Sequence, residues 1–159
     1  MDRPLRRPEE ILDYRPIKQI LKSAAVWTIG PADTVMAAVR LMEEKNIGFL
    51  VVLKNEAIVG VVSERDCVRR IILAGKSPEA TAVGDIMVKD VVKVGLEDTF
   101  AECMRLMRAH GVRHLPVLTK DKVVGVVSIR DLLREAADHH ARIIGELERE
   151  RMTMLTSMV

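Results

Sequence analysis

The sequence predicts an α/β protein made of two copies of one strand-helix-strand-strand-helix unit, followed by a long C-terminal helix. The first observation is a repeat: the run AIVGVVSERD at 57–66 returns as KVVGVVSIRD at 122–131, with the same offset of 65 positions that separates Gly60 from Gly125. The second is that strand-like and helix-like periods follow one another in the same order in both halves. A duplicated unit commonly packs against its copy, so we expect binding sites at the seam between them.

Each element of the first half has a local signal. A short apolar strand is expected at 26–29, and Gly30-Pro31 ends it. Asp33 and Thr34 are suitable N-cap residues for a helix in which Val35, Val39 and Met42 follow at helical spacing. Two β-branched runs at 49–53 and 57–62, separated by three polar residues, then predict a hairpin.

The second half repeats this order. A strand is expected at 91–94, a helix after Asp98, and a hairpin of strands at 114–118 and 122–127. Each hairpin leads into Ser-x-Arg-Asp, in which Ser63 or Ser128 can cap the next helix while Asp66 or Asp131 lies at its third position, as in a capping box. These four residues act either as helix caps alone or as caps that also bind a ligand.

Two such units can bury their open apolar faces against each other, which predicts a pseudo-twofold axis. The expected segments are an N-terminal stretch at 1–15 with a helical turn or two following at 16–21, a first repeat at 16–74, a linker at 75–82, a second repeat at 83–137 and a helical extension at 138–159. Ile144, Leu147, Met154 and Met158 lie near one face of the last helix, and a partner subunit is expected to cover them.

Composition excludes several classes of function. The chain has 159 residues, 48% of them hydrophobic and only 3% aromatic, which predicts a core of aliphatic side chains. A net charge of +2 lacks the basic footprint of a nucleic-acid-binding protein. No apolar run approaches the roughly 18 residues of a membrane-spanning helix, and the charged N-terminus lacks a secretion signal, so we expect a cytoplasmic protein without a membrane partner.

The chemistry-bearing residue types form no catalytic or metal-binding pattern. Cys67 and Cys103 have no paired spacing and are expected to be buried on helices in a reducing compartment. The histidines do not share a helical face, and no nucleophile lies beside a base. We therefore expect no metal, no catalytic cofactor and no catalysis.

At these residues the chain resembles a tandem pair of cystathionine-β-synthase (CBS) domains, also called a Bateman module. The family signature, glycine, two apolar residues, Ser or Thr and then Asp or Asn three positions later, matches residues 60–66 and 125–131, and a second family element matches RHLPV at 113–117. The resemblance covers about residues 16–137, and the whole chain is similar to the stand-alone CBS-pair proteins of bacteria.

The resemblance implies a regulatory ligand that contains adenosine: AMP, ATP, NAD or S-adenosylmethionine. By this likeness the signature aspartate holds the ribose hydroxyls, the serine at the helix N-terminus meets phosphate, and adenine lies between apolar strand residues. The resemblance also implies two clefts at the seam, each shared by both repeats. One would join Met87, Val92, Val112, Arg113 and His114 to Ser63, Arg65 and Asp66, and the other would join Leu21, Trp27, Ile47 and Gly48 to Ser128, Arg130 and Asp131.

The two clefts are not expected to be equal. The first repeat reads GFLVV at 48–52 and lacks the Arg and Pro of RHLPV, so one functional cleft is as consistent with the sequence as two. Trp27 either stacks on a base or fills space, and Arg65 and Arg130 either meet phosphate or are surface charges. Since Arg113 and His114 are grouped with Asp66, that cleft is expected to favour the more anionic ligands.

The function expected from the sequence is a homodimeric sensor of an adenine nucleotide or adenosyl ligand that catalyses nothing itself. The alternative is a dimeric scaffold that regulates a partner protein without any ligand. A change in melting temperature with nucleotide discriminates between the two.

Overall fold

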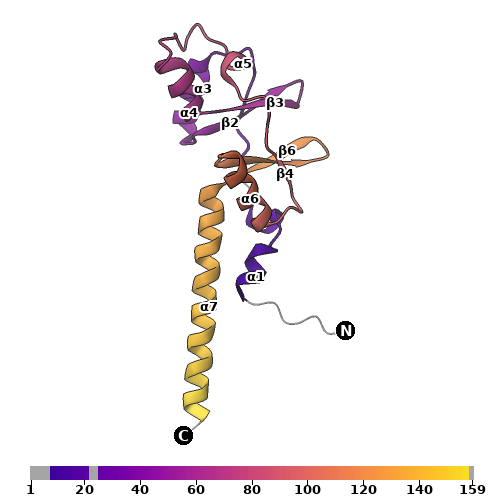
Figure 1. The fold of residues 1–159 in the computed structure, drawn as a ribbon, viewed down its shortest axis with the longest axis vertical. Coiled ribbons are helices and arrows are strands. Elements are labelled where there is room, and N and C mark those ends of the chain that lie inside the picture. The colour runs from indigo at the N-terminus through magenta and orange to yellow at the C-terminus, as the bar shows by residue number, and fades with distance from the viewer. Residues whose placement is uncertain (1–7, 22–24, 158–159) are drawn as a thin grey trace.

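The computed structural model describes residues 8–21 and 25–157, and it has the mixed α/β architecture that the repeat predicts (Figure 1). The first repeat contains, in order, β1 (Thr28–Ile29), α3 (Val35–Lys45), β2 (Phe49–Lys54), β3 (Ala57–Ser63), α4 (Glu64–Cys67) and the π-helical segment η1 (Val68–Ile72). The second repeat contains β4 (Val94–Gly95), α6 (Phe100–His110), β5 (His114–Thr119), β6 (Lys122–Ser128) and α7 (Ile129–Ser157). Short helices α1 (Pro8–Asp13) and α2 (Ile17–Ile20) precede the first repeat, and α5 (Val83–Ile86) precedes the second.

Both repeats form the same three-stranded sheet. The strand orders are β1-β2-β3 and β4-β5-β6, with the first pair of strands parallel and the second antiparallel in each. Both hairpins also contain a shift in strand register at the same position, after Val52 in β2 and after Val117 in β5. The predicted strand-helix-strand-strand-helix unit is therefore confirmed in both halves.

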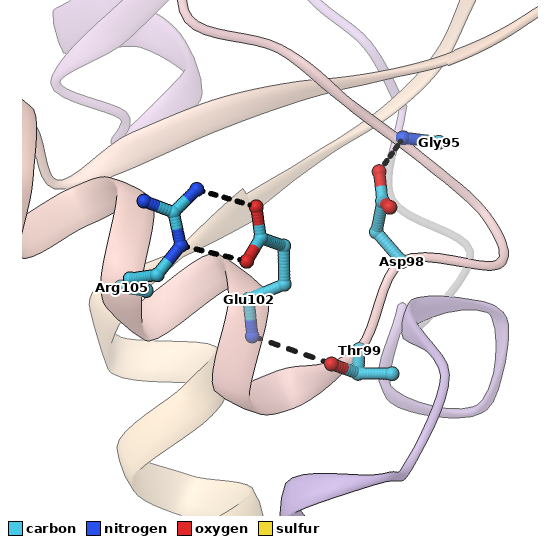
Figure 2. Close-up of polar contacts among 5 residues, drawn as sticks. All are labelled: Gly95, Asp98, Thr99, Glu102 and Arg105. Atoms are coloured by element: carbon cyan, nitrogen blue, oxygen red, sulfur yellow. Dashed lines mark hydrogen bonds and ion pairs between the residues drawn. The ribbon is translucent and has the colours of Figure 1, made fainter.

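The caps expected at the start of the long helices are confirmed. In the second repeat the Glu102 N–H donates to Thr99 Oγ1 (3.3 Å) and the Gly95 N–H donates to Asp98 Oδ2 (2.7 Å), as Figure 2 shows. Glu102 also accepts two hydrogen bonds from the Arg105 guanidinium (2.7 and 2.8 Å) on the next turn. The first repeat has the same pair of caps. These bonds fix the turn between the first strand and the helix.

The short helices before the repeats are exchanged between them. Helix α2 precedes the first repeat, yet Ile17 and Ile20 are buried in the core of the second. Helix α5 precedes the second repeat, yet Val83 and Ile86 are buried in the core of the first. Equivalent backbone bonds hold the two segments: the Ile17 N–H donates to the Asp98 carbonyl and the Val83 N–H to the Asp33 carbonyl, both at 2.8 Å.

Two separate apolar cores follow from this arrangement, one per repeat. Cys67 and Cys103 are buried in them, as expected, and both are free thiols. Three elements were not predicted: helix α1, whose Leu12 joins the second core, helix α5, and the π-helical turn that continues α4.

The predicted C-terminal helix is confirmed as one continuous element of 29 residues. Its first turns contact α6, α1 and α2, and its remainder extends beyond the body of the molecule (Figure 1). Arg15, which follows α1, forms an ion pair with Glu135 on α7, and this pair ties the N-terminal segment to the long helix. Met158, expected on the apolar face of α7, lies outside the described residues.

Candidate seam site

Each signature Ser-x-x-Asp forms a complete capping box at the end of a hairpin. In the first box, Asp66 Oδ2 accepts from the Ser63 N–H (2.9 Å) and from the Ser63 hydroxyl (2.6 Å), while the Asp66 N–H donates to Ser63 Oγ (3.3 Å). The second box, of Ser128 and Asp131, has the same three bonds at 2.8, 2.6 and 3.2 Å. The capping role expected from the sequence is therefore confirmed for both pairs.

The boxes use only one carboxylate oxygen of each aspartate. Every bond above that an aspartate side chain accepts ends on its Oδ2. Among the described residues nothing donates a hydrogen bond to Oδ1 of Asp66, and Oδ1 of Asp131 lies 3.9 Å from the Arg134 guanidinium on the next turn of α7. Each half-buried aspartate thus keeps an acceptor oxygen while its other oxygen fixes the orientation of the carboxylate.

The two boxes face each other across a stacked pair of rings. Phe49 is the cross-strand partner of Ser63, and His114 is the cross-strand partner of Ser128. The Phe49 and His114 rings stack with centroids 4.8 Å apart and planes inclined by 13°. Because cross-strand partners project from the same face of a sheet, the order across the seam is Ser63, Phe49, His114, Ser128.

His114 lies in a polar setting that belongs to the second repeat. Burial is the main cause that lowers the pKa of its imidazole, and the neighbouring Arg113 lowers it further. Asp131 raises that pKa and Arg130 lowers it, so both are close enough to act on the ring. His114 thus lies opposite Ser128 in its own sheet and, through the stack, against the cross-strand partner of Ser63. The grouping of Arg113 and His114 with Ser63 and Asp66 that the sequence suggests stays a prediction.

The exchanged segments cover the glycine strands that lead to the boxes. A Cβ on Gly60 in β3 would lie 2.6 Å from the Met87 Sδ and 3.0 Å from the Val88 carbonyl oxygen. A Cβ on Gly125 in β6 would lie 2.5 Å from a methyl carbon of Leu21. The signature glycines are thus the positions where a neighbouring segment approaches the strand too closely for a side chain. Met87 accordingly belongs to the box of Asp66 and Leu21 to the box of Asp131.

The remaining expected site residues are dispersed over the two repeats. Val92 and Val112 pack against the second core, and Ile47 packs against the first. Trp27 is 37% exposed, and the Lys45 ammonium lies over its ring, 4.5 Å from the centroid. Arg65 and Arg130 are exposed.

A charge difference between the boxes emerges at one pair of equivalent positions. Gly48 precedes β2 where Arg113 precedes β5, and the Glu64 side chain lies against Gly48, 2.9 Å from the place of a Cβ. The equivalent of Glu64 in the second repeat is the apolar Ile129. The first box therefore carries an additional carboxylate, and the second carries an additional guanidinium. The difference is visible in the sequence, where GFLVV at 48–52 has glycine at the position at which RHLPV at 113–117 has arginine.

No three His, Cys, Asp or Glu side chains in 8–21 and 25–157 are grouped so that they could hold a metal ion. No helix in the same ranges is long and apolar enough to cross a membrane.

Comparison with known proteins agrees with this geometry. The CBS domain model matches residues 17–73 and 83–138. The CBS domain-containing protein CBSX3, mitochondrial, of Arabidopsis thaliana is 34% identical over 148 residues, which cover 86% of this chain and 72% of that protein. A protein with CBS domains from Burkholderia ambifaria has a solved structure that is 40% identical and has a TM-score of 0.73, covering 76% of this chain and 93% of that one.

A third similar structure is a hexameric CBS-CP12 protein from bloom-forming cyanobacteria. It is 30% identical with a TM-score of 0.69, and the match covers 74% of this chain and 66% of that chain. The family model covers both halves of the sequence, and relatives and solved structures of similar length share the pair. This chain therefore belongs to the CBS domain family and contains two CBS domains.

Proposed function

We propose that this protein is a regulatory sensor that binds an adenine nucleotide or another adenosyl ligand at the seam and does not transform it. CBS pairs are in general regulatory ligand-binding modules, and the CBS domain model matches both halves of this chain. One similar solved structure is that of a signal-transduction protein with CBS domains. The observation that carries the proposal is the pair of capping boxes, each of which orients one carboxylate and leaves its Oδ1 as an acceptor beside the seam.

The proposed binding mode follows from what these groups can do. A fixed carboxylate accepts hydrogen bonds from the vicinal hydroxyls of a ribose. The N–H groups at the first turn of the following helix favour an anion such as phosphate. The apolar segment that covers the glycine strand, with Leu21 at one box and Met87 at the other, offers a surface to a flat base.

The two boxes are proposed to differ in ligand charge. Arg113, Arg130 and the N-terminus of α7 surround the Ser128–Asp131 box, which favours a phosphorylated ligand such as AMP or ATP. Glu64 over Gly48 makes the Ser63–Asp66 box less favourable for phosphate, so an uncharged or cationic adenosyl ligand such as S-adenosylmethionine fits it better. This assignment is the reverse of the one based on the sequence.

Binding and chemistry can be tested together. We expect AMP, ATP, NAD or S-adenosylmethionine to raise the melting temperature, and each compound to be recovered intact after prolonged incubation. Small molecules that copurify with the protein, released by denaturation and identified by mass spectrometry, would name the ligand. Hydrolysis that is lost on Asp131→Ala while the fold is retained would contradict the sensor function.

A ligand-independent scaffold is the second candidate, and exposed apolar side chains favour it. Ile72 in η1 is 65% exposed and Leu73 directly after it is 77% exposed, which is consistent with a protein partner. A melting temperature that no adenosyl compound changes would support this candidate. In either case we propose a cytoplasmic homodimer, in which α3 and α6 of the two copies contribute to the interface.

A further inference from the structure

Helix α7 carries two apolar stripes, and they differ in how far they are buried among the described residues. The inner stripe is buried or half-buried against the body of the protein and consists of Leu132, Ala136, His139 and Ile143. Continued at the same spacing, it meets the exposed Glu146 and Glu150, so the apolar stripe ends at Ile143. The inner stripe therefore accounts for the contacts of α7 with α1, α2 and α6.

The outer stripe is rotated by about 100° and does not end there. It consists of Leu133, Ala137, His140, Ile144, Leu147, Arg151 and Met154, all of them exposed. Leu133, Ile144 and Leu147 have exposed fractions of 58%, 57% and 60%. Figure 1 shows that α7 projects well beyond the rest of the described chain. Exposed aliphatic side chains of this size along one line mark an interaction surface.

The spacing of the outer stripe identifies the kind of partner. Its members are separated alternately by four and three residues, which is the heptad repeat of a left-handed coiled coil. Ala137, Ile144 and Arg151 occupy a positions, and Leu133, His140, Leu147 and Met154 occupy d positions. Isoleucine at a next to leucine at d, as in Ile144 and Leu147, favours two strands. From Leu133 to Met154 the outer stripe spans roughly 32 Å at 1.5 Å per residue.

We propose that the outer stripe of α7 pairs, in parallel and in register, with α7 of a second copy of this chain. Arg151 selects this partner and orientation, because a side chain at an a position of a parallel dimer packs beside the g residue of the other helix. That g residue is Glu150 of the second copy, so two Arg151–Glu150 pairs form across the twofold axis. The parallel orientation also brings the CBS pairs of both copies to the same end of the paired helices.

This proposal does not depend on the ligand proposed above. Its test measures disulfide crosslinking between two α7 helices and does not measure ligand binding. Facing d residues of a parallel coiled coil lie within the 4.4–6.8 Å of Cα separation that a disulfide needs. Cys67 and Cys103 are buried and do not compete for the oxidant. Leu147→Cys should therefore form a covalent dimer under mild oxidation at least ten times faster than Met152→Cys. Met152 is the matched control, because it is an equally exposed apolar residue at a b position of the same helix.

Charge reversal then tests the register. In the Leu147→Cys background, Arg151→Glu places its new carboxylate beside that of Glu150 of the second copy. The repulsion between them should slow the crosslinking at least ten-fold. Adding Glu150→Arg recreates the opposite-charge pair and should restore the rate. Equal rates for Leu147→Cys and Met152→Cys, or no crosslinking of either, would overturn the pairing. A Leu147→Cys rate that Arg151→Glu leaves unchanged would overturn the parallel register.

Discussion

The rings of Phe49 and His114 stack on each other at a centroid distance of 4.8 Å, although they occupy the same position in the two repeats. Each is the first residue of its strand and the cross-strand partner of a signature serine. One apolar ring and one titratable ring thus join the two boxes. The stack therefore places a titratable ring of the second repeat directly against a ring of the first.

The stability of the protein should fall as the pH is lowered through the ordinary pKa of histidine. Burial and Arg113 hold the pKa of His114 below its ordinary value, so the unfolded chain takes up a proton at a pH at which the folded chain does not. Stability is therefore lost from about pH 6.5 downward. His114→Phe keeps a ring against Phe49 and should reduce this loss in urea unfolding at pH 7.5 and pH 5.

The control for this prediction is His110→Gln, which changes an exposed histidine at the end of α6. It should leave the difference between the two pH values as in the parent protein. A His114→Phe variant with the full pH dependence of the parent would show that other groups cause it.

Gly60→Ala should destabilise the protein more than Gly125→Ala does. The new methyl group at Gly60 meets the Val88 backbone as well as Met87, whereas at Gly125 the nearest atoms all belong to the flexible end of Leu21. Overpacking of this kind costs about 1–3 kcal/mol, which urea unfolding resolves. Leu21→Ala should rescue Gly125→Ala.

By the same reasoning, Met87→Ala should rescue Gly60→Ala only in part, because the backbone contact persists. Equal and complete rescue at both glycines would contradict the difference between the two strands.

Asp131→Ala should weaken the binding of AMP or ATP more than Asp66→Ala does. A hydrogen bond to a charged group contributes about 1.5–3 kcal/mol, so the loss of one or two lowers affinity by roughly ten-fold or more. The larger effect belongs to Asp131 because Arg113 and Arg130 lie at its box. Isothermal titration calorimetry of both variants measures the difference.

Asp98→Ala is the matched control for these variants. It also removes a capping carboxylate, one that accepts from the Gly95 N–H away from the signature. Its affinity should equal that of the parent protein. If Asp66→Ala and Asp131→Ala also bind like the parent, then the signature aspartates are helix caps only and the scaffold function is favoured.

Neither cysteine should react with a thiol reagent while the protein is folded. Burial raises the pKa of the Cys103 thiol to about 12 and also raises that of Cys67, so both are protonated at pH 8 and shielded from the reagent. Colorimetric thiol titration should find two thiols in urea and react at least ten times more slowly in buffer. Fast labelling of the folded protein would contradict the burial of both side chains.

The sequence predicted the elements well because their signals are local and occur twice. Strand periodicity, the Asp-Thr caps and the two Ser-x-x-Asp boxes each depend on residues within a few positions of one another. The exchange of α2 and α5 could not be predicted in this way. Each has four residues with two buried side chains, which fit either core equally well until the tertiary structure is known.

The division of the site residues between the two clefts depends in the same way on contacts between distant segments, and it stays a prediction. The register of β5 against β6 places His114 opposite Ser128, and the stack places its ring on Phe49. Neither is a local signal. The close approaches at Gly60 and Gly125 likewise depend on the exchanged segments and have no counterpart in the periodicity.

The exchange of α2 and α5 also constrains the history of the duplication. The segment before each repeat contributes a helix to the core of the other repeat. A single repeat produced alone, without the exchanged helix that packs on it, would therefore expose part of its apolar core. Loss of either half of the chain therefore leaves the core of the other half incomplete. The two copies can diverge in charge, as Gly48 and Arg113 have, but they must be inherited and must unfold as one unit.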